Sequence, residues 1–258
     1  MDNQKIMIPQ NSYHFSVDDV FDSLIEVTDR QVGLFEHPFY AFLKKLHNQF
    51  GADISLYSFY QKNIDGKIHT LDEVRDLKEE LALEPWLYFG PHALDYNNPP
   101  YSQTPEKQIE TFEKIYGQLE RFVGREHFSR FVRLQYYSES YELAGYFKSR
   151  GVQALFTTDK NAGSYRMPAE VASELLAKGY SSHLGMNFIR TNYRVEFFVD
   201  ESLSEPEVTE RFKSTVEKYG FLVFYTHEIE MYKEQGRNMA ELMFKTARAL
   251  GLKSVVQA

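Results

Sequence analysis

Residues 13–26 read YHFSVDDVFDSLIE. An aromatic and β-branched run, typical of a strand, ends on two aspartates and leads into an amphipathic stretch with helical spacing. Similar runs recur along the chain, and each is nearly continuous in apolar side chains, as in parallel strands that are buried on both faces. We therefore predict strands at residues 13–17, 54–60, 86–89, 131–134, 152–157, 193–199 and 221–225.

The segments between these runs carry signals for helix starts and ends. Ser204 and Glu207 have capping-box spacing, and Gly220 follows the amphipathic stretch that they open. Pro105, directly after Thr104, stands where a first helical turn accepts proline. The same reasoning predicts helices after Thr70 and Glu73, from Pro168 to a stop at Gly179, and over residues 233–250.

Alternation of strands and helices predicts an α/β fold whose parallel strands are joined by right-handed crossovers. The seven runs lead us to expect one domain over residues 1–258, a single (β/α) barrel related to the TIM barrel. An open doubly wound sheet is the alternative, but no glycine-rich phosphate turn follows any predicted strand.

Composition excludes several classes of protein. The 258 residues contain no cysteine, which rules out disulfides, thiolate metal sites and a cysteine nucleophile. Acidic residues outnumber basic ones by 37 to 29, and the net charge of −8 argues against a nucleic-acid partner. We see neither a signal peptide nor a membrane span, and we expect a cytoplasmic protein without a membrane partner.

Polar residues at the carboxyl ends of barrel strands are candidates for chemistry. Asp18 and Asp19 end the first strand, and two carboxylates so close can share the work of binding a cation and acting as a base. The alternative is an acidic helix N-terminus with a capping aspartate.

Two histidines also stand at strand ends. His92, in GPHALDY, offers a nitrogen ligand to a metal, and His227, in FLVFYTHE, suits a general acid near neutral pH. The alternative for each is a structural histidine that bonds to nearby backbone or polar groups.

These segments, taken in chain order, resemble the motifs of the polysaccharide deacetylases (carbohydrate esterase family 4, NodB-homology domains). FSVDDV resembles the first motif, and the resemblance makes Asp18 the general base and Asp19 a metal ligand. His92 matches the first histidine of the H-x-x-x-H motif, whereas Tyr96 stands where the second is expected, so Asp95 is our candidate for an oxygen ligand.

The later motifs complete the resemblance. VRLQYY resembles the motif whose arginine orients the base, here Arg133, although Gln135 replaces its proline. Asp159 ends the following helix-and-strand segment, and FLVFYTHE makes His227 the general acid.

The resemblance implies a distorted (β/α) barrel of seven parallel strands. It also implies a metal-dependent hydrolase that releases acetate from an N- or O-acetylated sugar. The expected cofactor is a divalent metal ion, with Zn²⁺ first and Co²⁺, Ni²⁺ or Mn²⁺ as alternatives. A barrel that binds carbohydrate without turnover, and an amide hydrolase with a non-carbohydrate substrate, remain as alternatives. The partner is a small molecule or saccharide, and a homo-oligomer is compatible with the sequence. Candidate substrate-binding residues are Tyr136, Tyr137, Asp159, Arg166, Arg194 and Glu228.

Overall fold

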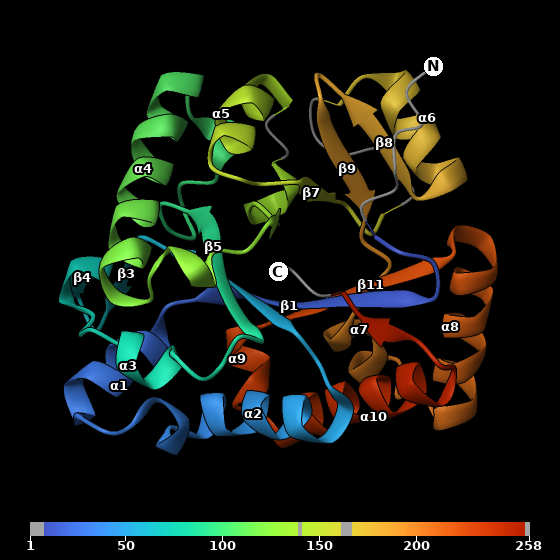
Figure 1. Ribbon diagram of the computed structural model, residues 1–258, viewed down its shortest axis with the longest axis horizontal. Helices are drawn as coiled ribbons and strands as arrows, with labels where there is room; N and C mark the ends of the chain where they lie inside the picture. Colours follow the sequence, from blue (N-terminus) through green and yellow to red (C-terminus); the bar gives the residue numbers. More distant parts are fainter. Residues whose placement is uncertain (1–7, 139–140, 161–166, 256–258) are drawn as a thin grey trace.

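The computed structural model describes residues 8–138, 141–160 and 167–255 (Figure 1). Its larger sheet has the strand order β10-β11-β1-β2-β5, with β12 also paired to β1, and all of these pairs are parallel. The strands are β1 (Ser12–Val20), β2 (Ile54–Phe59), β5 (Leu87–Ala93), β10 (Tyr193–Arg194), β11 (Phe221–His227) and β12 (Lys253–Ser254).

A smaller sheet continues the same parallel arrangement in the order β6-β7-β9-β8, and its last pair is antiparallel. It meets the larger sheet near β5 through a parallel bridge between Phe89 and Phe128, and near β11 through the bond from Asn192 N–H to the carbonyl of Val223. The smaller sheet comprises β6 (Phe131–Val132), β7 (Ala154–Thr157), β8 (Tyr180–His183) and β9 (Met186–Arg190), and a separate hairpin pairs β3 (Gln61–Ile64) with β4 (Lys67–Thr70).

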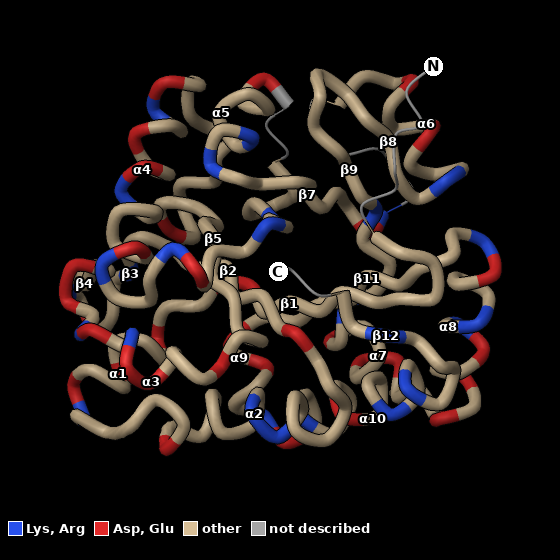
Figure 2. The backbone as a smooth tube through the Cα atoms, viewed as in Figure 1, with Lys and Arg blue, Asp and Glu red and all other residues tan. Residues whose placement is uncertain are grey.

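Helices surround the strands, which confirms the predicted α/β class (Figure 1). Charged residues recur along the longer helices and are rare along the central strands (Figure 2). No helix within the described ranges is long and apolar enough to cross a membrane. The α-helices are α1 (Asp22–Arg30), α2 (Pro38–Phe50), α3 (Lys78–Leu81), α4 (Pro105–Phe122), α5 (Ala144–Ser149), α6 (Ala169–Lys178), α7 (Val195–Asp200), α8 (Glu205–Tyr219), α9 (Glu228–Met231) and α10 (Glu234–Ala249). Short 3₁₀ turns are η1 (Leu34–Glu36), η2 (Leu71–Glu73), η3 (Pro100–Ser102), η4 (Arg125–His127), η5 (Gln135–Tyr137) and η6 (Tyr141–Leu143).

Several predicted helix ends are confirmed. Thr104 accepts a hydrogen bond from Lys107 N–H at the start of α4, and Ser204 and Glu207 form the capping box of α8. Gly179 and Gly220 end α6 and α8 with φ of 81° and 80°, a left-handed conformation that glycine adopts without a steric penalty.

Two local predictions are wrong. Residues 193–199 form only the short strand β10 before the chain turns into α7, because Val195 and Phe198 lie three residues apart and are buried on one helical face. The strand next to β7 is instead β9, at Met186–Arg190. The capping box at Thr70 does form, but it closes the single turn η2 rather than a long helix.

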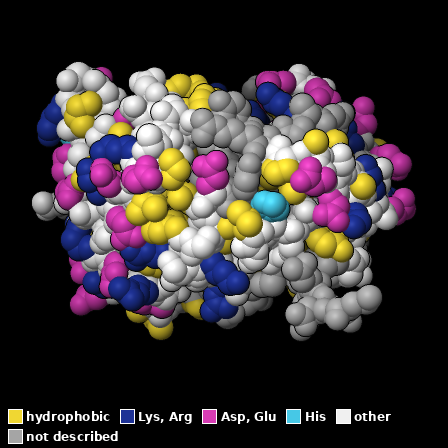
Figure 3. All heavy atoms as spheres, turned by 90° about the horizontal axis from the view of Figure 1, so that it is seen from above, with side chains coloured by type: hydrophobic (Ala, Val, Ile, Leu, Met, Phe, Trp, Pro, Cys, Tyr) yellow, Lys and Arg dark blue, Asp and Glu magenta, His cyan; other side chains and the backbone are white. Residues whose placement is uncertain are grey.

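The hydrophobic core lies among the strands and between the strands and the surrounding helices. It is strongly aromatic: Phe15, Phe89 and Phe224 are fully buried. The view from above in Figure 3 shows hydrophobic side chains interspersed with charges of both signs on this face.

Candidate active site

A bulge at the end of β1 brings two neighbouring carboxylates to one pocket. Successive side chains on a regular strand point to opposite faces. Here the register between β1 and β2 shifts between Val17 and Val20, and Asp19 has φ of 61°, in the left-handed region. An irregularity of this kind re-aims side chains. As a result, Asp18 and Asp19 both line the pocket, as the sequence led us to expect.

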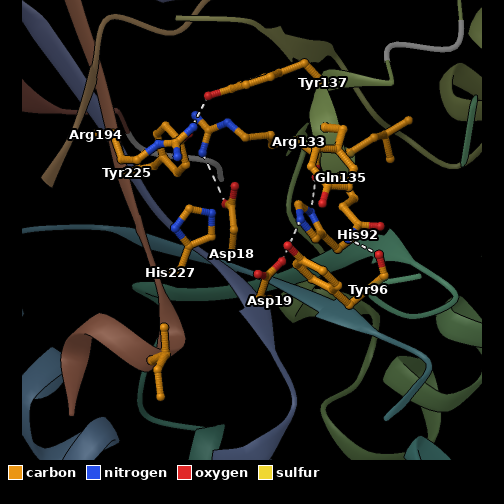
Figure 4. Close-up of a pocket in the computed structure, with 13 residues that line it drawn as sticks. Asp18, Asp19, His92, Tyr96, Arg133, Gln135, Tyr137, Arg194, Tyr225 and His227 are labelled. Carbon is orange, nitrogen blue, oxygen red and sulfur yellow. Dashed lines mark hydrogen bonds and ion pairs between the residues drawn. The ribbon is translucent and has the colours of Figure 1, made fainter. Parts of the chain in front are cut away.

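The pocket has a volume of ≈ 300 Å³ and lies where β1, β5, β6, β10 and β11 end (Figure 4). This volume is at the lower end of the range for small-molecule sites. Residues from segments far apart in sequence therefore converge on one space. Its lining comprises Asp18, Asp19, His92, Tyr96, Arg133, Leu134, Gln135, Tyr136, Tyr137, Arg194, Tyr225, His227 and Ile229.

Asp18 is buried and paired with a buried arginine. Arg133 Nη1 lies 3.2 Å from Asp18 Oδ1, and the two side chains are 1% and 3% exposed. Burial alone would lower the pKa of Arg133, but the charge of Asp18 opposes this and the pKa is raised. The guanidinium also donates to Thr191 Oγ1 and lies 4.1 Å from the ring centre of Tyr225. Arg133 is therefore fixed in place beside the carboxyl group of Asp18.

His227 is held by Glu196, a residue that the sequence did not connect with it. Its Nδ1 lies 2.8 Å from Glu196 Oε1. Burial alone would lower the pKa of His227, but the hydrogen bond and charge of Glu196, with the charges of Asp19 and Asp18, raise it overall. Because Nδ1 is engaged by Glu196, Nε2 is left to act on the pocket that His227 lines. Glu196 lies within the predicted strand 193–199, next to Arg194, and that position was the one signal that could have identified it.

His92 and Asp19 form a second pair. Nδ1 of His92 lies 2.7 Å from the carbonyl oxygen of Arg133, which can only accept, so Nδ1 carries the proton. Nε2 of His92 lies 3.1 Å from Asp19 Oδ1. The protonated ring donates a hydrogen bond to the carboxylate there, whereas the neutral ring offers the lone pair of Nε2 to a cation. Burial would raise the pKa of Asp19, but the hydrogen bond and charge of His92 help to lower it overall.

Asp19 and His92 are placed so that they could occupy two coordination positions of one divalent cation. Ligands bound to the same Zn²⁺ at about 2.0–2.2 Å lie roughly 3–3.5 Å from each other, depending on the coordination angle, and the atoms of Asp19 and His92 lie 3.1 Å apart. A ligating histidine also typically donates its other ring N–H to a backbone carbonyl. Within the described residues, however, no group of three or more His, Cys, Asp or Glu side chains could hold a metal ion.

Asp95 does not supply the third ligand that we expected. Its Oδ1 accepts from Asn97 N–H and Asn98 Nδ2, and its Oδ2 accepts from Gln61 Nε2. The carboxylate thus organises the turn after β5 and is not part of the pocket lining. Tyr96, at the position of the second family histidine, lines the pocket instead and is 60% exposed.

Tyrosines form one rim of the pocket. The rings of Tyr96 and Tyr101 lie 6.1 and 6.2 Å from that of Tyr136, which is 51% exposed. Tyr136 and the more buried Tyr137 have φ of 53° and 51°, a conformation that is uncommon for bulky residues and clusters at functional sites. The hydroxyl of Tyr137 bonds to that of Tyr225. Both predicted substrate-binding tyrosines therefore line the pocket.

The other predicted substrate-binding residues have separate locations. Arg194 lines the pocket, and Asp159 lies behind it, with Oδ2 3.8 Å from Arg194 Nη2. The prediction for Glu228 was wrong, because this residue is buried outside the pocket. Its carboxylate accepts hydrogen bonds from the N–H groups of Phe21, Asp22 and Ser23 and so satisfies the backbone donors at the start of α1. Arg166 lies outside the described residues.

No family model and no curated protein sequence matches this chain. Solved structures do share its fold. A polysaccharide deacetylase from Bacillus cereus aligns with a TM-score of 0.50 and 12% identity, over 95% of this chain and 90% of that one. The catalytic domain of a peptidoglycan N-acetylglucosamine deacetylase from Eubacterium rectale aligns with a TM-score of 0.51 and 12% identity, over 97% and 90%.

A 4-α-glucanotransferase from Thermococcus litoralis aligns with a TM-score of 0.50 and 12% identity. The alignment covers 94% of this chain but only 38% of that one. Identities this low concern the fold rather than the reaction. These structures show that the chain shares the fold of the two deacetylases.

Proposed function

We propose that this protein is a hydrolase that removes an acetyl group from an N- or O-acetylated sugar or a related small amide. One observation carries the proposal: a carboxylate and a histidine, each held by its own partner of opposite charge, line the same pocket. Arg133 keeps Asp18 ready to accept a proton, and Glu196 keeps His227 ready to donate one. The fold shared with two deacetylases supports the same reaction class.

In the proposed reaction, Asp18 accepts a proton from water as the water oxygen attacks the acetyl carbonyl carbon. His227 then donates a proton through Nε2 to the leaving nitrogen or oxygen as its bond to that carbon breaks. The products are acetate and the free amine or alcohol. Positioned acids and bases of this kind each contribute about 10²- to 10⁴-fold to a rate.

Asp19 and His92 are the residues that would hold a divalent cation, with Zn²⁺ the first candidate and Co²⁺, Ni²⁺ or Mn²⁺ as alternatives. A bound cation would supply Lewis-acid polarisation of the acetyl carbonyl and activation of water. With two protein ligands instead of the usual three of catalytic zinc sites, we expect the cation to be held weakly.

Acetate release from a panel of N- and O-acetylated mono- and oligosaccharides tests the proposal. The protein is assayed after removal of metal and again with Zn²⁺, Co²⁺, Ni²⁺ or Mn²⁺ added. We expect release from at least one saccharide, and we expect Asp95→Asn, outside the pocket, to keep the parent rate. If no saccharide yields acetate under any metal condition, the hydrolase proposal is overturned.

Tyr96 favours one alternative function, since it stands at the position of a family metal ligand. A barrel that has lost this ligand would bind a carbohydrate without turnover. That function predicts saccharide binding in the same panel, unaffected by added metal and without acetate release.

A further inference from the structure

Arg194 forms the wall of the pocket next to β11. It ends β10 and is paired in register with Tyr225 of β11. Its guanidinium carbon lies 4.6 Å from the ring centre of Phe197 and 5.2 Å from that of Tyr225. Two aromatic contacts restrict the orientation of the planar group, while the side chain stays 23% exposed to the pocket. The cation is thus held in place and is accessible to a ligand.

The hydrogen-bonding capacity of this guanidinium is not exhausted by the protein. The nearest carboxylate atom, Oδ2 of Asp159, lies 3.8 Å from Nη2, which is too far for a hydrogen bond. Nε of Arg194 and Oδ2 of Asp159 are both buried, and neither makes a hydrogen bond with the residues that the structure describes. Asp159 therefore attracts Arg194 from behind without occupying its donors.

The second arginine of the pocket is in a different state. Arg133 donates to Asp18, Ser16 and Thr191, and its charge is balanced by Asp18 at hydrogen-bond distance. Arg194 has a looser set of partners, the Asp159 carboxylate at 3.8 Å and a hydrogen bond with the side chain of Tyr137, so its guanidinium keeps donors that an anion in the pocket can use. A planar monoanion suits the fork of a guanidinium, and the nearby Asp159 disfavours a dianion.

We propose that Arg194 binds a carboxylate carried by the substrate, so that the substrate class is an acidic acetylated sugar, such as an acetamido-uronic acid. This inference rests on the proposed function for the reaction, but its binding test does not need turnover.

The strand register sets the distance between the bound carboxylate and the reacting group. Asp18 pairs with His227, and Arg194 pairs with Tyr225, two residues earlier on β11. With about 3.3 Å per residue and about 4.8 Å between strands, the Cα atoms of Arg194 and His227 lie roughly 8 Å apart. The carboxylate therefore belongs to the sugar that carries the acetyl group or to its immediate neighbour.

The experiment compares two ligands that differ at one carbon: the methyl glycosides of N-acetylglucosamine and of N-acetylglucosaminuronic acid. Their dissociation constants are measured by calorimetry or NMR titration for the parent protein, Arg194→Gln and Arg194→Lys. Arg211→Gln is the matched control, because Arg211 lies over Phe198 and pairs with Glu201 away from the pocket. Urea unfolding of each variant verifies that it is folded.

We expect the parent to bind the acidic glycoside about 10- to 100-fold more tightly than the neutral one, the range for a charge-assisted hydrogen-bonded pair. Arg194→Gln should abolish this preference and leave affinity for the neutral glycoside within about twofold. Arg194→Lys should show part of the preference for the acidic glycoside, since lysine keeps the positive charge but lacks the planar guanidinium that binds a carboxylate through two hydrogen bonds.

Equal affinity of the parent for the two glycosides, or a preference that survives Arg194→Gln, would overturn the assignment. Tighter, Arg194-dependent binding of N-acetylglucosamine 6-phosphate would overturn the choice of a carboxylate. Acetate release measured in parallel separates the two proposals. Equal turnover of both glycosides contradicts this inference alone, whereas Arg194-dependent binding without any acetate contradicts only the hydrolase.

Discussion

Replacement of Glu196 by glutamine tests how the protein prepares its proton donor. The substitution keeps the shape of the side chain but removes the charge that lies 2.8 Å from His227 Nδ1. A hydrogen bond to a charged group contributes about 1.5–3 kcal/mol, and one pKa unit corresponds to about 1.36 kcal/mol. Glu196→Gln should therefore lower the pKa of His227 by about 1–2 units.

NMR titration of the His227 ring in metal-free protein measures this pKa without relying on turnover. Glu201→Gln, at an exposed ion pair with Arg211, is the control and should leave the pKa of His227 unchanged. In the hydrolase assay, the alkaline limb of the rate profile should move to lower pH by the same amount. An unchanged His227 pKa in Glu196→Gln would refute this account of the acid.

The free energy of unfolding should also depend on the pair formed by Glu196 and His227. Because the pKa of His227 in the folded protein is raised above the ordinary histidine value of 6.5, the protonated pair stabilises the fold fully below that pH. This contribution is lost as the pH rises through the folded pKa. The gap in unfolding free energy between the parent and Glu196→Gln should thus be larger near pH 5.5 than near pH 9, to be measured by urea denaturation.

Three further predictions concern other parts of the site. Glu228→Ala should destabilise the protein by roughly 2–3 kcal/mol in urea unfolding, because backbone donors of α1 lose their acceptor. The control Glu230→Ala removes a surface ion pair with Lys233 and should cost under about 0.5 kcal/mol. Equal effects of the two substitutions would contradict a special role for Glu228. Asp19→Asn and His92→Gln should each lower Zn²⁺ affinity at least about tenfold in calorimetric titration, and unchanged affinity would place the cation elsewhere. Tyr96→Ala should weaken saccharide binding about 2- to 10-fold, as expected for the loss of one aromatic contact, and no change would show that this rim does not contact the sugar.

The sequence predicted the positions of strands with strong apolar runs and of helices with clear caps. It was wrong for residues 193–199, because the aromatic run that indicated a strand fits equally well on the buried face of a short helix. The strand β9 was missed, since Met186–Arg190 is short and its apolar residues are interrupted by Asn187 and followed by Arg190.

The pocket was predicted in part. Asp18, Asp19, His92, Arg133 and His227 converge, because the carboxyl ends of parallel strands meet at one end of the barrel. Glu228 was misassigned because strand-end position alone cannot distinguish a side chain that enters the pocket from one that accepts backbone N–H groups next to it. The pairing of Glu196 with His227 depends on the path of α7 beside β11, which a strand prediction could not provide.

Acetate release by Asp18→Asn, compared with the parent on the best saccharide of the panel, tests the central claim most directly. The account predicts that release falls at least about 100-fold, while the dissociation constant of the saccharide, measured on the same samples, stays within about threefold. Release at the parental rate by folded Asp18→Asn would contradict the claim that Asp18 is the base of this site.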